Sequence, residues 1–236
     1  DGTIYAPFGQ RPPTRAQILG TCIHSRLLEG EVIYHRRPEG IDLRTKEGKA
    51  WRETLPPGSI EQPGDVCDVI DLLALRWQRW CEDRLSTAGR QWWHDGLVEY
   101  VYMWGDCKIR PDLYVPGPNV LVSLKSCTRA QALEWERAKL WSTDARIGYD
   151  VQEAHYIAGI TDACGDRPEA IHAVVTTDTA EIFGFVLGDD TIDRAERRRQ
   201  TALEIIRAGG VWAPPPLRAT RPVPAYLTAY DEETND

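Results

Sequence analysis

The pattern of hydrophobic and polar positions divides the chain into helical and extended segments. Apolar residues recur every three or four positions over residues 15–29 and 64–85, which predicts two amphipathic helices. Trp77 and Trp80 share the spacing of the aliphatic residues in 64–85, so we expect them in the core rather than stacked on a nucleic-acid base. Further helices are predicted at 45–53, within a polar and proline-containing connection that spans 30–64, and at 130–141, 149–163 and 190–208.

After Leu97 a period of two replaces the helical period. The alternation predicts a β-hairpin of strands 97–104 and 107–115 around the turn Gly105-Asp106, followed by a third strand at 120–126. A second strand pair is predicted at 170–176 and 180–187. Strands with helices between and around them predict an α/β fold, in which a central mixed β-sheet is flanked by helices.

Length and composition indicate one globular domain over residues 1–236, with an N-terminal arm at 1–14 and a proline-rich segment with an acidic tail at 211–236. No apolar run approaches the roughly 20 residues that span a bilayer, so we expect a soluble protein with no membrane partner. The six cysteines include no C-x-x-C pair, which favours free thiols in a reducing cytoplasm. Residue 1 is not Met, and we do not expect it to be the natural start.

The net charge of −8 argues against a generally basic nucleic-acid coat, although a channel can be locally basic on an acidic protein. Charge therefore does not decide the partner.

Residues suited to phosphodiester hydrolysis lie on the predicted strands. Glu99 and Asp112 lie on the two strands of the hairpin, and Lys125 lies near the end of the third strand. Mg²⁺ takes oxygen ligands such as carboxylates, and a lysine adds a positive charge beside the attacked phosphate. Each residue alone has an ordinary alternative, because a Pro-Asp pair is usually a turn and a Lys after an apolar strand usually marks the solvent boundary. Their combination with Gln152 and Tyr156 on the following helix favours a metal-dependent phosphodiesterase.

The predicted helix at 149–163 presents polar side chains on one face. Tyr149, Gln152 and Tyr156 are spaced at i, i+3 and i+7, which places them on the same side of a helix. We expect this face to border the site. Basic side chains near the presumed site would contact phosphate, and the candidates are Arg110, Arg129 and Arg146.

The order of these motifs resembles the nuclease domain of exodeoxyribonuclease VIII, the RecE-type exonucleases of prophages. The resemblance runs from about residue 14 to residue 225. That family lies within the PD-(D/E)xK superfamily, which also contains lambda exonuclease. The segments that carry the resemblance are Leu19-Gly20-Thr21 with His24, Arg44-Thr45, Glu99, Arg110-Pro111-Asp112, Lys125-Ser126 and Tyr149-Asp150-Val151-Gln152 with Tyr156.

The resemblance implies a metal site. His24, Glu99 and Asp112 match metal-site positions, and the backbone carbonyl of Leu124 would be a further ligand. Without the resemblance, a lone histidine beside an apolar stripe is more often a packed or half-exposed residue than a ligand. The implied ion is Mg²⁺, for which Mn²⁺ can substitute.

The resemblance also implies an activity. Lys125 matches the catalytic lysine, and Gln152 and Tyr156 match the helix that supports the site and contacts DNA. Tyr149 lies on the same face of this helix and is a further candidate for contact with DNA. The implied protein is a phage- or prophage-encoded exonuclease of the bacterial cytoplasm, which degrades the 5′ strand at the ends of linear double-stranded DNA. It would leave a 3′ single strand for a single-strand annealing protein, and it would form a ring-like homo-oligomer, a trimer or tetramer.

Position 123 departs from the family, which has an acidic residue two positions before the lysine where this chain has Ser123. A hydroxyl is a poorer Mg²⁺ ligand than a carboxylate. In some restriction endonucleases of the superfamily a Ser stands at this catalytic position and a Glu of the following helix replaces the ligand, which makes Glu134 and Glu136 candidates here. A solvated helix face is the alternative for both. Ser123 therefore leaves a second hypothesis, a catalytically weakened or silent DNA-end binding module.

Overall fold

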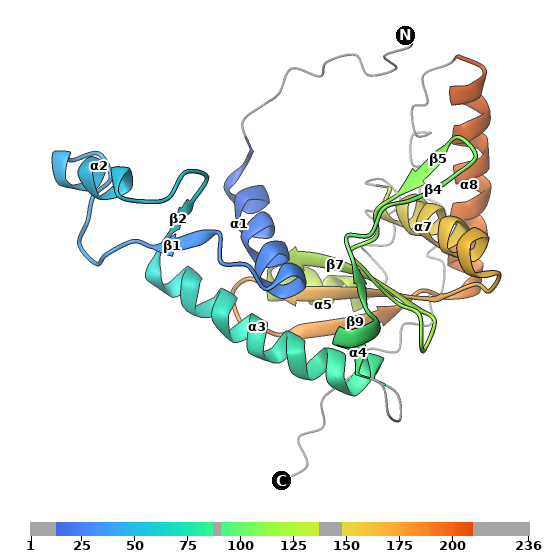
Figure 1. Cartoon of the computed structure of the whole chain (residues 1–236), viewed down its shortest axis with the longest axis horizontal. Helices are drawn as coiled ribbons and strands as arrows, with labels where there is room; N and C mark the ends of the chain where they lie inside the picture. Colours follow the sequence, from blue (N-terminus) through green and yellow to red (C-terminus); the bar gives the residue numbers. More distant parts are fainter. Residues whose placement is uncertain (1–12, 87–90, 137–147, 210–236) are drawn as a thin grey trace.

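A five-stranded mixed β-sheet forms the centre of the protein (Figure 1). The computed structural model describes residues 13–86, 91–136 and 148–209. The strand order is β3-β6-β7-β8-β9; β7 and β8 are parallel, and the other neighbours are antiparallel. The strands are β3 (Leu97–Val98), β6 (Leu113–Val115), β7 (Val120–Cys127), β8 (Glu169–Thr176) and β9 (Ile182–Val186). The predicted α/β fold with a central mixed sheet is confirmed.

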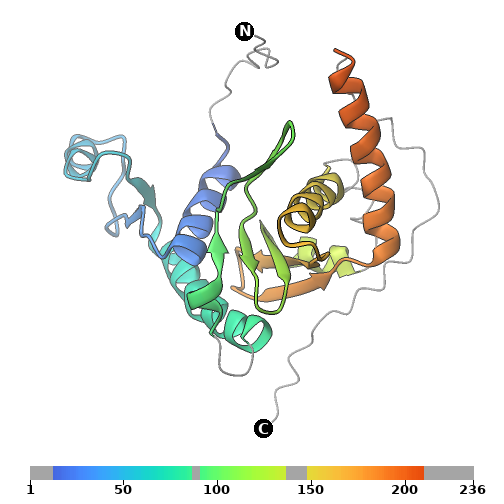
Figure 2. The ribbon, with the colours of Figure 1, turned by 45° about the vertical axis from the view of Figure 1, so that its right-hand side comes forward.

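Helices cover both faces of this sheet (Figure 2). Along β7, Val122 and Leu124 face α1 and α3, whereas Leu121 faces α7 and α8. Because successive side chains of a strand point to opposite faces, Ser123 and Lys125 point toward the α7 side. None of the described helices is both long and apolar enough to cross a membrane. The helices of the two layers are α1 (Arg15–His24), α3 (Gly64–Leu85), α5 (Arg129–Glu136), α7 (Tyr149–Cys164) and α8 (Asp189–Arg207).

Local signals set the ends of the helices that border the site. α7 lies between two glycines, Gly148 at φ 90° and Gly165 at φ 85°, a backbone conformation that glycine adopts without a steric cost. α1 begins at a capping box formed by Thr14 and Gln17. Directly after His24 the helix widens into the π-helical turn η1 (Ser25–Glu29), so the helix predicted at 15–29 has the expected extent but a different hydrogen-bond pattern in its last turn. Such turns occur frequently at functional sites.

The prediction of one continuous hairpin from strands 97–104 and 107–115 is wrong, because each predicted strand is divided into two. β3 pairs with β6 in the main sheet, while β4 (Tyr102–Trp104) and β5 (Cys107–Ile109) form a separate two-stranded ribbon. The pairing breaks where Glu99 adopts a φ of 50° and where Pro111 has no N–H to donate. The backbone N–H of Glu99 still donates to the carbonyl of Asp112 at 3.2 Å, so the break holds these two acidic residues side by side.

The connection between α1 and α3 contains more regular structure than expected. A parallel pair of short strands, β1 (Tyr34–Arg36) and β2 (Ile60–Gln62), lies within it, and α2 (Lys46–Glu53) confirms the helix predicted at 45–53. The short helix α4 (Trp92–Asp95) was also not predicted. Segments of three or four residues are too short to show a period. The remaining predicted elements are present within two residues of their ends, except that positions 137–141 of the helix predicted at 130–141 lie outside the described residues.

The ribbon β4–β5 packs on α7 at a position that has room only for glycine. A β-carbon at Gly159 would lie 2.6 Å from Cδ1 of Ile109 and 2.8 Å from Cζ3 of Trp104. We expect Gly159→Ala to lower the free energy of unfolding by about 1–3 kcal/mol through overpacking, although the same change in an open helix stabilises by about 0.5–1 kcal/mol. Gly20→Ala in α1 is the control, because its nearest atom, Oγ of Ser126, lies 3.4 Å away. Urea unfolding that finds Gly159→Ala as stable as Gly20→Ala would contradict this packing.

Candidate metal centre

Three side chains with metal-ligating atoms converge at the break in the hairpin. The candidate ligand atoms of His24, Glu99 and Asp112 all lie within 4.8 Å of one another. His24 ends α1, Glu99 follows β3 and Asp112 precedes β6, so three separate segments meet there. All three side chains are half-buried. The structure thus brings together the three side chains that the resemblance assigns to a metal site.

The backbone of Leu124 joins this group. Its N–H donates to Oδ2 of Asp112 at 2.7 Å, and its carbonyl oxygen lies 3.2 Å from Nε2 of His24. Two ligands at neighbouring corners of an octahedral Mg²⁺ site, with bonds of about 2.1 Å, are about 3 Å apart. The spacing between the imidazole and the carbonyl therefore suits an ion held by both. With two carboxylates and a carbonyl oxygen in the set, the residues present fit Mg²⁺ or Mn²⁺.

The surroundings of Glu99 perturb the ionisation of its carboxyl group. Burial raises the pKa of its carboxyl above the usual value, the charge of Asp112 acts in the same direction, and the guanidinium of Arg110 opposes both. Nε of Arg110 lies 2.7 Å from Oε2 of Glu99, with the arginine side chain 63% exposed and the glutamate side chain 22% exposed. Arg110, which was predicted to contact DNA, is therefore paired with a candidate metal ligand. The ion pair is partly exposed and contributes little stability.

Lys125 lies on the other side of Leu124 and is held by α7. Its Nζ donates to Oε1 of Gln152 at 3.4 Å and lies 4.8 Å from the ring centroid of Tyr149. Nε2 of Gln152 donates in turn to the hydroxyl of Tyr156 at 2.9 Å. Two side chains of the predicted face, Tyr149 and Gln152, thus contact the lysine, and α7 sets the position of its ammonium group.

Other predicted residues are not brought to the centre. Nε of Arg129 pairs with Glu181 at 2.7 Å, at the turn between β8 and β9. Arg146 lies outside the described residues. Glu134 is exposed on α5, and the side chain of Glu136 is not among those described.

A different glutamate contacts Ser123. Oγ of Ser123 donates to Oε2 of Glu153 at 2.6 Å, and Nε2 of His172 lies 3.1 Å from the same oxygen. All three side chains are fully buried on the α7 side of the sheet. Sequence reasoning did not single out Glu153 or His172. One signal was present, because Glu153 is spaced at i, i+4 and i+7 with Ile157 and Ile160, which places a charge on the apolar face of α7.

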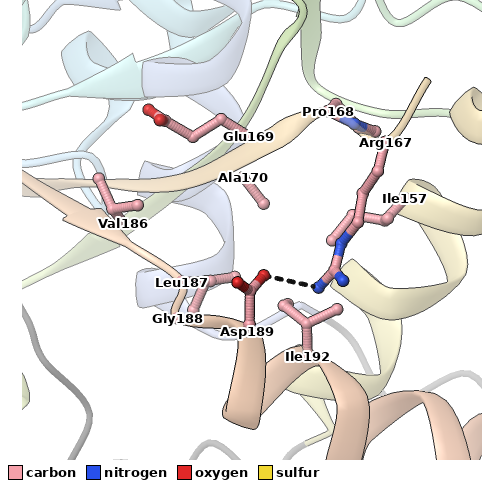
Figure 3. A pocket seen from close by; sticks show the side chains of 10 residues that line it. All are labelled: Ile157, Arg167, Pro168, Glu169, Ala170, Val186, Leu187, Gly188, Asp189 and Ile192. Carbon is pink, nitrogen blue, oxygen red and sulfur yellow. Dashed lines mark ion pairs between the residues drawn. The ribbon is translucent and has the colours of Figure 1, made fainter.

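A shallow cavity of about 400 Å³ lies away from these residues (Figure 3). It lies where β8 begins and β9 ends, and the ion pair between Arg167 and Asp189 borders it at 3.3 Å. In the strand register Glu169 is opposite Val120, five positions before Lys125, or about 17 Å along the strand. None of the candidate residues lines this cavity, so it does not extend the site.

Comparisons with known proteins leave the family open. No protein-family model matches the chain, and no curated protein matches it. A crystal structure of a protein from Eubacterium rectale, named "Putative exonuclease", matches with a TM-score of 0.56 and 18% identity over 86% of this chain and 71% of that chain. The chain shares the fold of that protein. At this identity the likeness concerns the fold alone, and membership of the RecE-type family stays a prediction.

Asp112 and Lys125 allow the metal-binding role to be separated from other roles. Asp112→Asn keeps an oxygen that can accept the N–H of Leu124 but removes the charge, so we expect Mn²⁺ affinity to fall by about tenfold or more. Lys125→Ala removes no ligand and should bind Mn²⁺ about as tightly as the parent. Calorimetric titration of both variants measures this difference. Parent-like affinity in Asp112→Asn would remove Asp112 from the metal centre.

Proposed function

We propose that the protein is a metal-dependent nuclease that hydrolyses phosphodiester bonds in DNA. The observation that carries the proposal is the convergence of His24, Glu99, Asp112 and the Leu124 carbonyl directly beside Lys125. A catalytic lysine next to a group of acidic ligands is an arrangement suited to cleaving a phosphodiester without a covalent intermediate. A protein that only needed a stable fold would gain little from half-buried like charges at a break in its sheet.

The proposal gives each group a defined task. A bound divalent ion would neutralise phosphate charge and lower the pKa of a water. Asp112 is oriented by the N–H of Leu124, so that its other oxygen remains available to the ion. Lys125 would place its positive charge against the attacked phosphate, and Gln152 limits where that ammonium group can lie. His24, whose Nε2 lies 3.2 Å from the Leu124 carbonyl oxygen, would supply a neutral nitrogen ligand.

We further propose that the substrate is an end of linear double-stranded DNA. Support comes from the order of motifs along the chain and from the name of the structurally similar protein. Degradation of the 5′ strand, a ring-like homo-oligomer and an annealing partner stay predictions from the resemblance, as does a location in the bacterial cytoplasm.

A second candidate function is a DNA-end binding module without cleavage. Ser123 favours it, because the strand lacks the carboxylate that the family places two residues before Lys125. A site with fewer carboxylates holds Mg²⁺ less tightly, and the same fold could then bind DNA without cutting it.

Digestion of end-labelled DNA distinguishes the two candidates. We expect the parent to degrade linear duplex in Mg²⁺ or Mn²⁺, to leave closed circular duplex intact and to stop when the metal is chelated. Lys125→Ala should lose at least about a hundredfold in rate, because a charge aimed at the transition state contributes roughly 3 kcal/mol. Binding of linear duplex with no degradation in either metal would replace the nuclease by the binding module, and cleavage of circles would exclude an exonuclease.

The dependence of binding on salt tests the role of the basic side chains. In an Asp112→Asn background, which prevents cleavage, we expect duplex affinity to fall by at least about tenfold between about 50 and 200 mM salt. Adding Lys125→Ala should make the slope of log K against log salt shallower by about 0.9 if the lysine contacts a phosphate. Fluorescence anisotropy with a labelled duplex gives both slopes. Identical slopes would show that Lys125 does not reach the DNA backbone.

A further inference from the structure

A fully buried polar group adjoins the candidate metal centre along β7, because Ser123 directly precedes Leu124. It consists of Ser123 on β7, His172 on β8 and Glu153 on α7, each with a relative exposure of 0%. Ser123 and His172 are opposite each other in the parallel β7–β8 register, and both contact the same oxygen, Oε2 of Glu153. Two strands and a helix thus direct polar groups at one carboxylate oxygen.

The position of Glu153 follows from the way α7 lies on β7. Consecutive residues of the helix meet alternate residues of the strand: Gln152 contacts Lys125, and Glu153 contacts Ser123. An aspartate at 123 in the rotamer of the serine would place its carboxyl carbon where Oγ of Ser123 now lies. The carboxylate of Glu153 therefore lies next to the place that the missing strand carboxylate would fill.

Only one oxygen of Glu153 has its hydrogen bonds satisfied. Within the described part of the chain, Oε1 of Glu153 is buried and has no hydrogen-bond partner. Burying a carboxylate with an unsatisfied oxygen is unfavourable unless a positive charge or a donor compensates for it. The imidazole of His172 contacts the other oxygen. Among the described residues, none donates a hydrogen bond to Oε1, so this oxygen can accept one from a group outside them.

The carboxylates of the metal centre and Glu153 act on a common neighbour. Burial is the main reason that the pKa of Tyr156 is raised, and the charges of Asp112, Glu153 and Glu99 each raise it further. Glu153 is not part of the group of ligand atoms that lie within 4.8 Å of one another. Mg²⁺ usually keeps several of its waters, so a carboxylate just beyond the direct ligands can still bind the hydrated ion.

We propose that Glu153 replaces the acidic residue that position 123 lacks. Its Oε1 accepts a hydrogen bond from the water shell of the metal ion, while Ser123 and His172 hold Oε2 and so fix the direction of the carboxylate. The third negative charge of the centre comes from α7 rather than from β7 or from the exposed Glu134 of α5. This inference rests on the proposed metal-dependent function and assigns Glu153 as a positioning residue for the ion.

Mn²⁺ affinity, measured by calorimetry without DNA, tests the assignment independently of cleavage. We expect Glu153→Gln, which keeps the shape of the side chain, to bind Mn²⁺ about 10–100-fold more weakly, as is usual when a partner of the ligand shell is lost. Glu134→Gln is the matched control, because it removes the same charge from an exposed position of α5, and it should bind like the parent. Parent-like affinity in a folded Glu153→Gln overturns the assignment.

Moving the carboxylate back to the strand provides a second measurement. Ser123→Asp with Glu153→Ala should recover most of the Mn²⁺ affinity that Glu153→Ala alone loses. A purely structural role for the buried group predicts no such recovery, because the double variant lacks the contact between Glu153 and His172. If Glu153→Gln does not fold, the test is made with the double variant alone. A folded double variant that binds Mn²⁺ much more weakly than the parent overturns the assignment.

The outcome also separates this inference from the proposed function. Mn²⁺ binding that requires both Asp112 and Glu153, without cleavage of DNA, would leave the assignment of Glu153 standing and remove the nuclease. If the parent cleaves DNA and the Glu153→Gln variant binds Mn²⁺ normally, the nuclease stands and the assignment of Glu153 is overturned.

Discussion

The hydrogen bond between the N–H of Leu124 and the carboxylate of Asp112 is the interaction on which the site depends. The β6–β7 ladder pairs Leu113 with Val122, and the chain before Leu113 has left the sheet, so β7 extends beyond its partner. Asp112 accepts the backbone donor of Leu124, whose loss in a partly buried position would cost about 1–3 kcal/mol. The carbonyl of the same residue is contacted by His24. The side chain of Asp112 thus takes the place of a neighbouring strand as the hydrogen-bond acceptor. This arrangement brings an imidazole, a carboxylate and a backbone oxygen together at one edge of the sheet.

Hydrophobic periodicity predicted the layers of the fold but not this edge. The helix at 64–85 and the strands at 120–126 and 170–176 have long, regular patterns, and the structure reproduces them within a residue. The alternation after Leu97 is equally regular, yet the pairing breaks at Glu99, where φ is positive. Periodicity reports which face a residue buries, not whether its backbone continues a ladder. The π-helical turn after His24 could not be predicted for the same reason, because its side-chain pattern remains helical.

The same distinction applies to the site. Glu99, Asp112 and Lys125 could be selected because carboxylates and a lysine on neighbouring strands have few other reasons to occur together. Glu153 and His172 are 19 positions apart and are separated by the end of one helix and the start of one strand, so no local spacing connects them. Buried polar groups are recognisable in a sequence only as violations of an apolar pattern, and their partners come from tertiary structure. Sequence order points to Glu134 and Glu136 of the next helix in the chain, whereas the glutamate that contacts Ser123 lies on α7.

Under the proposed function, an acidic protein must attract the phosphates of DNA. The chain has a net charge of −8, and residues 231–236 contribute four of its negative charges. At the centre, Glu99 is neutralised by Arg110, while Asp112 has no such cation among the ion pairs of the described residues. Under the proposed function a divalent ion would neutralise both carboxylates, which would leave Arg110 free to meet a phosphate. Because coupling between two ligands is reciprocal, an ion that improves the binding of DNA is itself held more tightly once DNA is present. Under the proposed function, the charge that the substrate meets is that of the site with its ion, so the net charge of the chain does not decide its partner.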